Sequence, residues 1–449
     1  MRFIPHTDAD IAAMLEVTGA ASLDELIAHV PANLRASATI QLPPGLDEAR
    51  VVGEISALAN KNHGASGFAS FLGGGYYRHF IPAAVRAIIA RAEFATGYTP
   101  YQAEASQGTT QAIFEFQTMI AQLTGLEVAN ASMYDGASAA AEAVLMARRL
   151  LPQRNVVAIS RALWPDYRDT IETYLSPQGE LAVAELPFNQ ASGTTMLEAL
   201  ARLPAERLLC TVIGYPNLFG AIEPLARFAD ATHGAGGILI AVTAEALALA
   251  LLKPPGAHGA DIAVGEGQSF GLPVQFGGPG LGFMAARLGH VRQMPGRLVG
   301  QTHDRDGRRA FCLTLAAREQ HIRRERATSN ICTNHSLCAL AATVYLSVMG
   351  RRGLRELAAR NVELAHLAHS ALIAADVQPV FAAPFFNEFA VSLPKPEAAL
   401  AAAEAAGVIA GMALGSRFPE LPQAVLVSVT ELNSPNEIER LATVLGGKH

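Results

Sequence analysis

The sequence predicts an α/β protein whose large domain carries a mostly parallel sheet and is followed by a smaller C-terminal α+β domain. Three observations indicate this fold class. Between about residues 100 and 290, short apolar segments bounded by turn residues alternate with helical patterns. These segments lack polar alternation, which is typical of parallel strands covered on both faces. After about residue 310, longer helical patterns precede two further strand-like segments.

The elements follow in chain order. We expect an N-terminal helical arm over residues 1–75, a large α/β domain over 76–312 and a small α+β domain over 313–449. The glycine-rich segment 71–82 suits an exposed loop before a helix. The expected strands are 155–160, 208–216, 236–242, 260–267, 385–393 and 424–431, and the expected helices include 137–151, 225–233, 318–326, 336–349 and 354–375.

Composition excludes several classes of protein. The 449 residues are 50% hydrophobic and 16% charged, so the chain can bury a large core and is neither disordered nor collagen-like. A net charge of −6 disfavours nucleic-acid binding. Four cysteines without a CxxC pair suggest a reducing, cytoplasmic compartment. The N-terminus carries acidic residues and the most apolar stretch, 238–252, is too short to span a bilayer, so we expect neither export nor a membrane partner.

Common catalytic motifs are missing from the sequence. It has no GxxxxGK[ST], no GxSxG and no HExxH, and Gly265-Glu266-Gly267 is followed by Phe270 where a dinucleotide fingerprint needs glycine. His366 and His369 share a helix but have no third ligand nearby in sequence, so we expect no metal site.

The turn Met133–Ser138 directly precedes an alanine-rich helix. Free backbone N–H groups at such a helix start can hold an anion. The alternative is an ordinary helix cap at Asp135 or Ser138.

Two neighbouring polar segments also allow two interpretations each. The basic segment 318–326 is either a patch for an acidic partner or phosphate, or a solvated helix with internal ion pairs. The segment 327–334, rich in hydroxyl and amide side chains, is either a satisfied hydrogen-bond network or a turn that faces a ligand.

Lysine is scarce, and its positions are informative. A pyridoxal phosphate (PLP) enzyme needs a lysine amine for its covalent bond to the cofactor. The strand 260–264 is suitably placed, but the loop 265–270 that follows it contains no lysine.

Several longer stretches resemble one family over nearly the whole chain, the α-type subunit or N-terminal half of the P-protein (glycine decarboxylase) of the glycine cleavage system. The stretches that carry the resemblance are 71–73, 98–108, 116–119, 123–126, 129–132, 264–268, 276–279, 295–297, 318–324 and 327–333. The resemblance implies a PLP-dependent transferase fold of the aspartate aminotransferase type. It also implies PLP-dependent decarboxylation of glycine, with release of CO2 and aminomethyl transfer to the lipoyl group of the H-protein.

This chain departs from the family's partner-type subunit at the cofactor position. That subunit has a His-Lys-Thr-Phe stretch whose lysine carries PLP, and Gln268 and Ser269 lie there in this chain. The partner type also has an aspartate for the pyridine nitrogen, near which this chain has Val242-Thr243 and then Glu245. We therefore expect no catalytic residue and no covalent PLP in this chain.

The resemblance further implies a homologous PLP-bearing partner, subunit 2, in a heterotetramer of two plus two chains with shared active sites. In that case this chain would complete the partner's site, bind glycine there and help to admit the lipoyl arm. The candidates to line the shared site are Tyr98, Tyr101, Gln102, Glu104, Thr328, Ser329 and Asn330. The alternative is a non-catalytic scaffold that stabilises or regulates its partner. An independent homodimeric PLP decarboxylase is disfavoured by Gln268 and Ser269.

Overall fold

The computed structural model describes residues 6–38, 42–62, 67–179, 181–275 and 277–447. The chain divides into two compact units, Met1–His63 and Gly64–His449, which are described separately.

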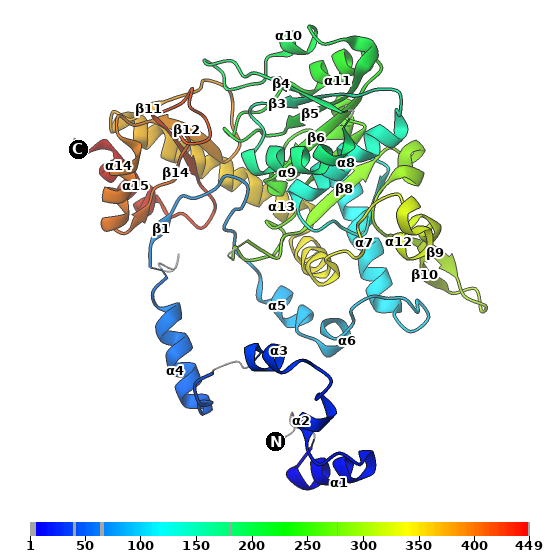
Figure 1. Ribbon diagram of the computed structural model, residues 1–449. Coiled ribbons are helices and arrows are strands. Elements are labelled where there is room, and N and C mark those ends of the chain that lie inside the picture. The colour runs from blue at the N-terminus through cyan, green and yellow to red at the C-terminus, as the bar shows by residue number, and fades with distance from the viewer. Residues whose placement is uncertain (1–5, 39–41, 63–66, 180, 276, 448–449) are drawn as a thin grey trace. The chain divides into compact units, whose positions relative to one another are not determined.

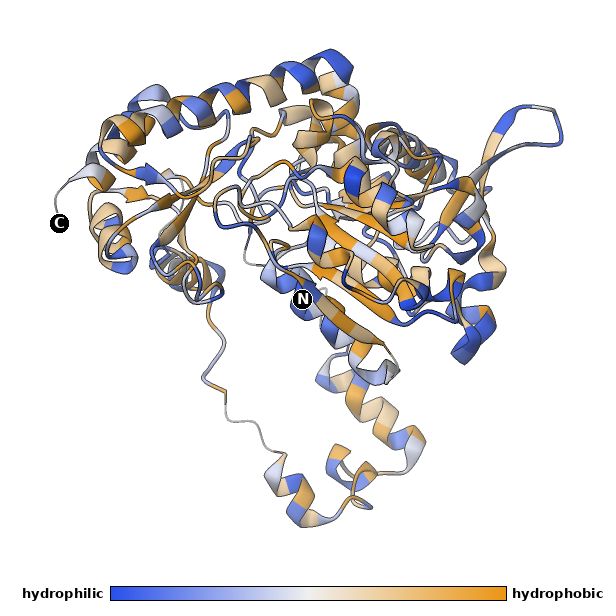
Figure 2. Cartoon of the chain, turned by 90° about the horizontal axis from the view of Figure 1, so that it is seen from above, coloured by the Kyte–Doolittle hydropathy of each residue, from blue (hydrophilic) through white to orange (hydrophobic). Residues whose placement is uncertain are grey.

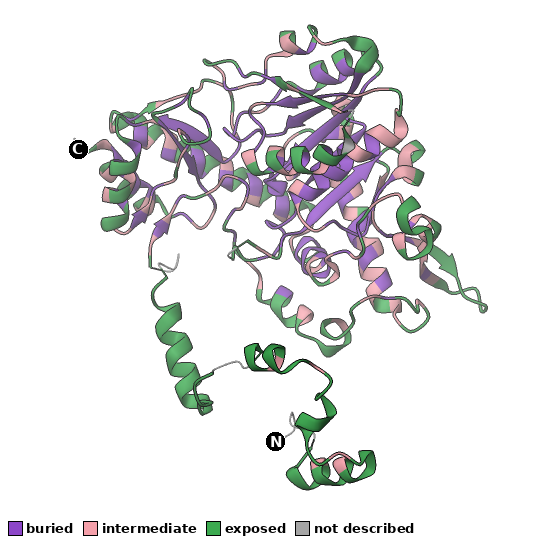
Figure 3. Cartoon of the chain, viewed as in Figure 1, coloured by how far each residue is buried: buried purple, intermediate pink, exposed green. Residues whose placement is uncertain are grey.

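The first unit is helical. It contains α1 (Asp8–Thr18), α2 (Leu23–Leu26), α3 (Ala32–Ser37) and α4 (Glu48–Ala59). Thr7, Ser22 and Asp47 cap three of these helices by accepting a backbone N–H with their side chains. None of the described residues in this unit is buried (Figure 3). The described part of this unit therefore has no hydrophobic core of its own.

A seven-stranded sheet forms the centre of the second unit (Figure 1). Its strand order is β2-β8-β7-β6-β5-β3-β4, and the five strands from β7 to β4 are parallel. Strand β8 runs antiparallel to both of its neighbours. The bounds are β2 (Val128–Ala129), β3 (Val156–Ser160), β4 (Ala182–Leu186), β5 (Leu208–Gly214), β6 (Ile238–Thr243), β7 (Ile262–Glu266) and β8 (Gly282–Ala286). The prediction of an α/β protein with a mostly parallel sheet is thus confirmed.

Helices cover both faces of this sheet. Alternate strand residues such as Val157 and Val264 pack with helices α8 (Gly136–Leu150) and α9 (Pro165–Leu175). Residues facing the other way, such as Ala241 and Phe283, pack with α7 (Gln107–Thr124), α11 (Leu225–Gly234) and α13 (Ser336–Ala374). The central strands are accordingly apolar along their length (Figure 2), as two-sided burial requires.

A smaller antiparallel sheet follows near the C-terminus, in the order β11-β12-β15-β14. The second half of α13 packs with α14 (Pro396–Ala405) and α15 (Pro435–Gly446) in the core of this region. The bounds are β11 (Gln378–Pro379), β12 (Glu388–Ser392), β14 (Met412–Ala413) and β15 (Ala424–Ser428), and β1 (Ala69–Ser70) pairs in parallel with β13 (Val408–Ile409). The predicted domain boundaries at 75/76 and 312/313 stay a prediction.

The remaining elements connect these sheets. Helices α5 (Ala83–Ile89) and α6 (Ala92–Ala95) precede α7, and α10 (Leu197–Leu200) lies between β4 and β5. An antiparallel hairpin of β9 (Leu298–His303) and β10 (Arg309–Thr314), which the sequence did not reveal, precedes α12 (Gln320–Arg323). No helix among the described residues is long and apolar enough to cross a membrane.

Two expectations were wrong. Residues 318–326 do not form one helix, because Arg324 adopts φ 52°, ψ −121° and separates α12 from a short 3₁₀ turn. The segment 71–82 does precede a helix, but it is not an exposed loop, because only Leu72, Arg78 and Phe80 of its residues are exposed. Phe71 and Tyr77 are 0% and 1% exposed, because they pack in the interior of the second unit. The predicted helices 336–349 and 354–375 meet at Gly350 (φ 61°) within α13.

Candidate functional site

The carboxyl ends of β6 and β7, the start of α8 and the segment 71–82 meet at one edge of the central sheet. The Gly136 N–H at the start of α8 bonds to Glu266 at the end of β7. Tyr77 and His79 bond to Gln268 and Glu245, which follow β7 and β6. Ligands of parallel α/β proteins commonly bind at this kind of edge.

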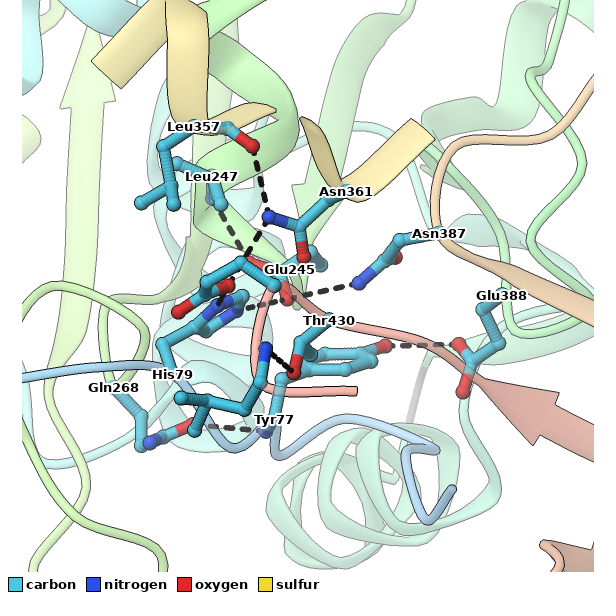
Figure 4. A network of polar contacts seen from close by, with 12 residues as sticks. Tyr77, His79, Glu245, Leu247, Gln268, Leu357, Asn361, Asn387, Glu388 and Thr430 are labelled. Carbon is cyan, nitrogen blue, oxygen red and sulfur yellow. Dashed lines mark hydrogen bonds and ion pairs between the residues drawn. The ribbon is translucent and has the colours of Figure 1, made fainter. Parts of the chain in front are cut away.

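Gln268 is held firmly where the resemblance places a lysine in the partner-type subunit. Its Oε1 accepts the Tyr77 N–H at 2.9 Å (Figure 4), and its Nε2 donates to the Leu272 carbonyl at 2.7 Å. The neighbouring Ser269 is also buried, and its hydroxyl has no partner among the described residues. Neither side chain offers an amine.

Glu266 fills the start of α8, where the sequence left open an anion site or an ordinary cap. Its Oε2 accepts the Gly136 N–H at 3.0 Å, and its Oε1 accepts those of Leu281 at 2.6 Å and Gln268 at 3.0 Å. Burial raises the pKa of this carboxyl to about 7, although the N–H donors favour its charged form. Asp135 caps α8 by accepting the Ser138 N–H, so an ordinary cap is present, while the Gly136 N–H of the same helix start donates to the Glu266 carboxylate.

The surroundings of this carboxyl are tight. A Cβ at Gly136 would overlap with the Tyr167 hydroxyl, and one at Gly280 would lie 3.0 Å from Glu266 Oε2. Burial raises the pKa values of Tyr76 and Tyr167, and the charge of Glu266 raises them further. Both tyrosines therefore remain neutral hydroxyls beside it.

A buried ion cluster lies beyond β6. His79 Nε2 is 3.0 Å from Glu245 Oε2 (Figure 4), and its Nδ1 is 2.8 Å from Glu431 Oε2. Burial lowers the pKa of His79, but the two carboxylates outweigh it and raise the pKa to about 10. His79 is therefore an imidazolium that donates from both nitrogens. Glu245 also accepts the Leu247 N–H, so its carboxylate is fully engaged within the chain.

A second buried carboxyl closes the segment 71–82 against β12. Glu388 accepts the Tyr77 hydroxyl at 2.9 Å (Figure 4) and the Gly74 N–H at 2.7 Å. Burial raises the pKa of Glu388 to about 8. A Cβ at Gly73 would overlap with the Glu388 side chain, so this close approach requires glycine.

The first predicted site segment lies at the surface of the second unit. Tyr98 and Tyr101 are 78% and 66% exposed, and Gln102 and Glu104 are exposed as well. The Arg297 guanidinium lies 5.5 Å from the centre of the Tyr101 ring and donates to the Thr99 hydroxyl at 3.2 Å. Arg297 thus fixes a loop whose polar groups are free to face another molecule.

The second predicted segment lines a cavity of about 670 Å³ beside α8. Thr328, Ser329 and Asn330 share its wall with Glu142 and Arg149. Glu142 is 2% exposed, and one of its carboxylate oxygens has no hydrogen-bond partner. Burial raises the pKa of Glu142, against a hydrogen bond from Ser329 and the charge of Arg149. Ser329 thus takes part in a hydrogen-bond network with Glu142, and all three residues of 328–330 line the cavity.

The two predicted segments are connected rather than in direct bonding contact. Arg297 Nε lies 3.5 Å from Glu319 Oε2, and the Thr328 N–H donates to the carbonyl of the adjacent Arg318 at 3.0 Å. Further along, Asn334 and the Cys332 N–H bond to residues 131 and 134. The two segments are therefore linked to each other through Arg297, Glu319 and Arg318.

Two arginines of the basic run 318–326 make contacts within the chain. Arg318 donates to the carbonyls of Met294 and Gly296, and Arg323 donates to the Ala317 carbonyl. The described residues contain no group of three or more His, Cys, Asp or Glu side chains that could hold a metal ion. His366 and His369 both pack on the Phe385 ring.

Sequence reasoning missed the side chains that fill the edge. The sequence places Glu266 in a failed dinucleotide fingerprint and in the stretch 264–268 that carries the resemblance, and it indicates no role for His79, Glu388 or Glu431. The available signal was a run of glycine, tyrosine and histidine at 73–79, since glycines that permit close approach often accompany buried polar contacts.

Comparison with known proteins gives consistent matches. A family model described as glycine cleavage system P-protein matches residues 1–445. A protein named probable glycine dehydrogenase (decarboxylating) subunit 1 from Geobacillus thermodenitrificans is 48% identical over 449 residues, covering 100% of this chain and 99% of the relative. Proteins of the same name from Anaeromyxobacter dehalogenans and Moorella thermoacetica are 48% and 49% identical, covering 98% and 100% of this chain and 99% of each relative.

Solved structures agree with these relatives. A glycine decarboxylase (P-protein) of the glycine cleavage system, in inhibitor-bound form, is 46% identical, with a TM-score of 0.89 over 99% of both chains. A sphingosine-1-phosphate lyase from Burkholderia pseudomallei is 15% identical, with a TM-score of 0.66 over 91% of this chain and 92% of its own. The latter shows the fold alone, and together these structures confirm the expected PLP-dependent transferase fold.

Proposed function

This chain belongs to the glycine cleavage system P-protein family, and from this premise we propose that it is the subunit of glycine decarboxylase that carries no cofactor and completes the site of a homologous partner. The partner would hold PLP and decarboxylate glycine, with aminomethyl transfer to the lipoyl group of the H-protein. One observation carries the proposal: Gln268 is buried and bonded at both ends of its amide, at the position where the resemblance places the PLP lysine of the partner-type subunit.

PLP does not fit the residues of this chain. Its phosphate would need the anion site at the start of α8, where Glu266 already accepts the Gly136 N–H. Its pyridine nitrogen would need a carboxylate near the end of β6, where Glu245 is paired with His79. A cofactor would have to displace both interactions and would find no amine at position 268.

The exposed loop 98–104 supports a shared site. Tyr98 and Tyr101 are large aromatic side chains that a monomer would normally bury at least in part. Arg297 holds the Tyr101 ring without burying it. Hydroxyls from this loop and from Thr328, with the amide of Asn330, can bind the carboxylate of glycine or orient it at the partner's site.

The helical first unit supports an obligate partner. Val51, Val52, Ile55 and Leu58 lie on one face of α4 and are 43–60% exposed. Isolated helices of this length are marginal in water, and most helices in proteins are stabilised by packing an apolar face. We assign this face to the homologous partner subunit, in a heterotetramer of two plus two chains. All four cysteines are free, which is consistent with the cytoplasmic location that we also propose.

The exchange of glycine carboxyl with labelled CO2, measured with lipoylated H-protein, tests the proposal. Each chain is assayed separately and then as a mixture. We expect neither chain alone to be active and the mixture to restore exchange. Full activity of the partner alone would leave this chain a scaffold, and activity of this chain alone would refute the proposal.

A further inference from the structure

We propose that the Glu266 carboxylate occupies the position that a cofactor phosphate would take at the start of α8. This side chain then prevents even non-covalent binding of a phosphorylated cofactor to this subunit. This inference rests on the proposed function and deepens it, because the observation that carries that function, Gln268, accounts only for the missing covalent attachment. Many proteins bind phosphorylated cofactors without covalent attachment, so a missing lysine alone would leave a binding site in place.

The geometry around Glu266 is that of a bound anion. Backbone N–H groups from three separate segments converge on one carboxylate: Gly136 at the start of α8, Gln268 after β7 and Leu281 before β8. The three N···O distances lie between 2.6 and 3.0 Å. Glu266 is 1% exposed, so its carboxylate belongs to the protein interior and does not fold in from the surface.

The donors suit a phosphate as well as they suit a carboxylate. Helix α8 is fifteen residues long, and its N-terminus carries the partial positive charge of the helix dipole. The Gly136 N–H points along this dipole, which is the arrangement that binds phosphate groups in many α/β proteins. The same edge of the sheet carries Gln268, the position of the missing lysine, so the cradle is in the place that a cofactor phosphate would need.

The Glu266 carboxylate and a phosphate cannot both bind these three N–H groups. Gly136 has no room even for a Cβ because of the Tyr167 hydroxyl, and Glu266 Oε2 fills the space in front of Gly280. A phosphate would also bring like charge against a carboxylate that cannot move to solvent. Removing the Glu266 side chain should therefore open an anion site with its donors still in place.

Ligand-dependent thermal unfolding of the isolated full-length chain tests the inference. The probes are pyridoxamine 5′-phosphate, which has no aldehyde for a covalent bond, and inorganic phosphate, each against sodium chloride at matched ionic strength. We expect neither probe to shift the wild-type midpoint beyond the chloride control. We expect Glu266→Ala to gain a saturable shift with both probes, corresponding to at least about tenfold tighter binding.

Glu223→Ala is the matched control. Glu223 is likewise buried, accepts a backbone N–H from Thr195, and has its pKa raised to about 7 by burial. Its removal should also lower stability but should give no probe-dependent shift, which separates site binding from the general stabilising effect of phosphate.

Two results would overturn the inference. One is a folded Glu266→Ala protein whose response to the probes equals that of Glu223→Ala. The other needs no variant: saturable binding of pyridoxamine 5′-phosphate to the wild-type chain, measured by calorimetry and competed by phosphate. Neither result depends on glycine turnover, so failure here is distinguishable from failure of the proposed function.

Discussion

His79 Nε2 lies 3.0 Å from Glu245 Oε2, so a histidine from the loop before α5 is paired with a carboxylate just beyond β6 in the interior of the protein. The second ring nitrogen bonds to Glu431, beyond β15. One imidazolium thus joins the large sheet, the smaller sheet and the glycine-rich segment that crosses the candidate site.

This pairing predicts a stability that falls with rising pH. The pKa of His79 is raised from 6.5 to about 10, so between these values the native state keeps a proton that the unfolded chain releases. The contribution of the protonated His79 to the free energy of unfolding is complete below pH 6.5 and is lost as the pH rises towards 10. The urea midpoint should therefore fall over this range in the wild type, and less steeply in His79→Gln. Exposed His29→Gln is the control, and parallel slopes for all three proteins would contradict the prediction.

Tyr77→Phe tests the second buried carboxyl. The change removes the hydroxyl that donates to Glu388 at 2.9 Å and leaves a buried acceptor with one partner fewer. We expect a loss of about 1–3 kcal/mol in the free energy of unfolding. Tyr98→Phe, at an exposed ring, should change stability by less than about 0.5 kcal/mol. Equal effects of both variants in urea unfolding would show that the Glu388 contact adds nothing.

Tyr101→Phe tests the shared site. If its hydroxyl is a positioned donor at the partner's site, its loss should lower glycine exchange of the assembled pair by about 100- to 1,000-fold. Assembly, followed by sedimentation, should be unchanged. Thr443→Ala, which removes an exposed hydroxyl on α15, should leave exchange intact. Reduced assembly with normal turnover per complex would instead favour the scaffold.

Ile55→Asp tests the apolar face of α4. A charge on this exposed face should weaken assembly with the partner by at least about tenfold, because a buried unpaired charge is costly at an interface. Ala57→Asp is the matched control, since two residues along a helix place the side chain on the opposite face. Equal affinities of the two variants for the partner would exclude this face from the interface.

The alternation of strands and helices could be read from the sequence because it is a local signal. Strands β3, β5, β6 and β7 are unbroken apolar runs bounded by turns, and α8 and α11 lie between them, so periodicity and length were sufficient. The two-residue strands β1 and β13 were missed because their pairing joins residues 69 and 408 and leaves no pattern in either segment. The expected helix 318–326 is interrupted at Arg324, which has a positive φ. An arginine in the sequence gives no indication of such a backbone conformation.

The sequence indicated one part of the candidate site, the positions 268 and 269, because the lysine that a PLP enzyme needs is missing there. Gln268 and Ser269 were found because a lysine was expected there. Glu266 could not be found in this way, because its role depends on N–H groups of residues 136 and 281 that only the fold brings together. The same holds for His79, whose two carboxylate partners lie 166 and 352 positions away in the chain.

Borohydride reduction of the assembled complex tests the central claim most directly, namely that the cofactor belongs to the partner. Reduction fixes PLP to whichever lysine carries it, and peptide mapping by mass spectrometry identifies that lysine. We predict a stoichiometric label on the partner chain and none on this chain, because position 268 is glutamine and Glu266 fills the phosphate site. A stoichiometric label on Lys253, or on any other lysine of this chain, would contradict the account.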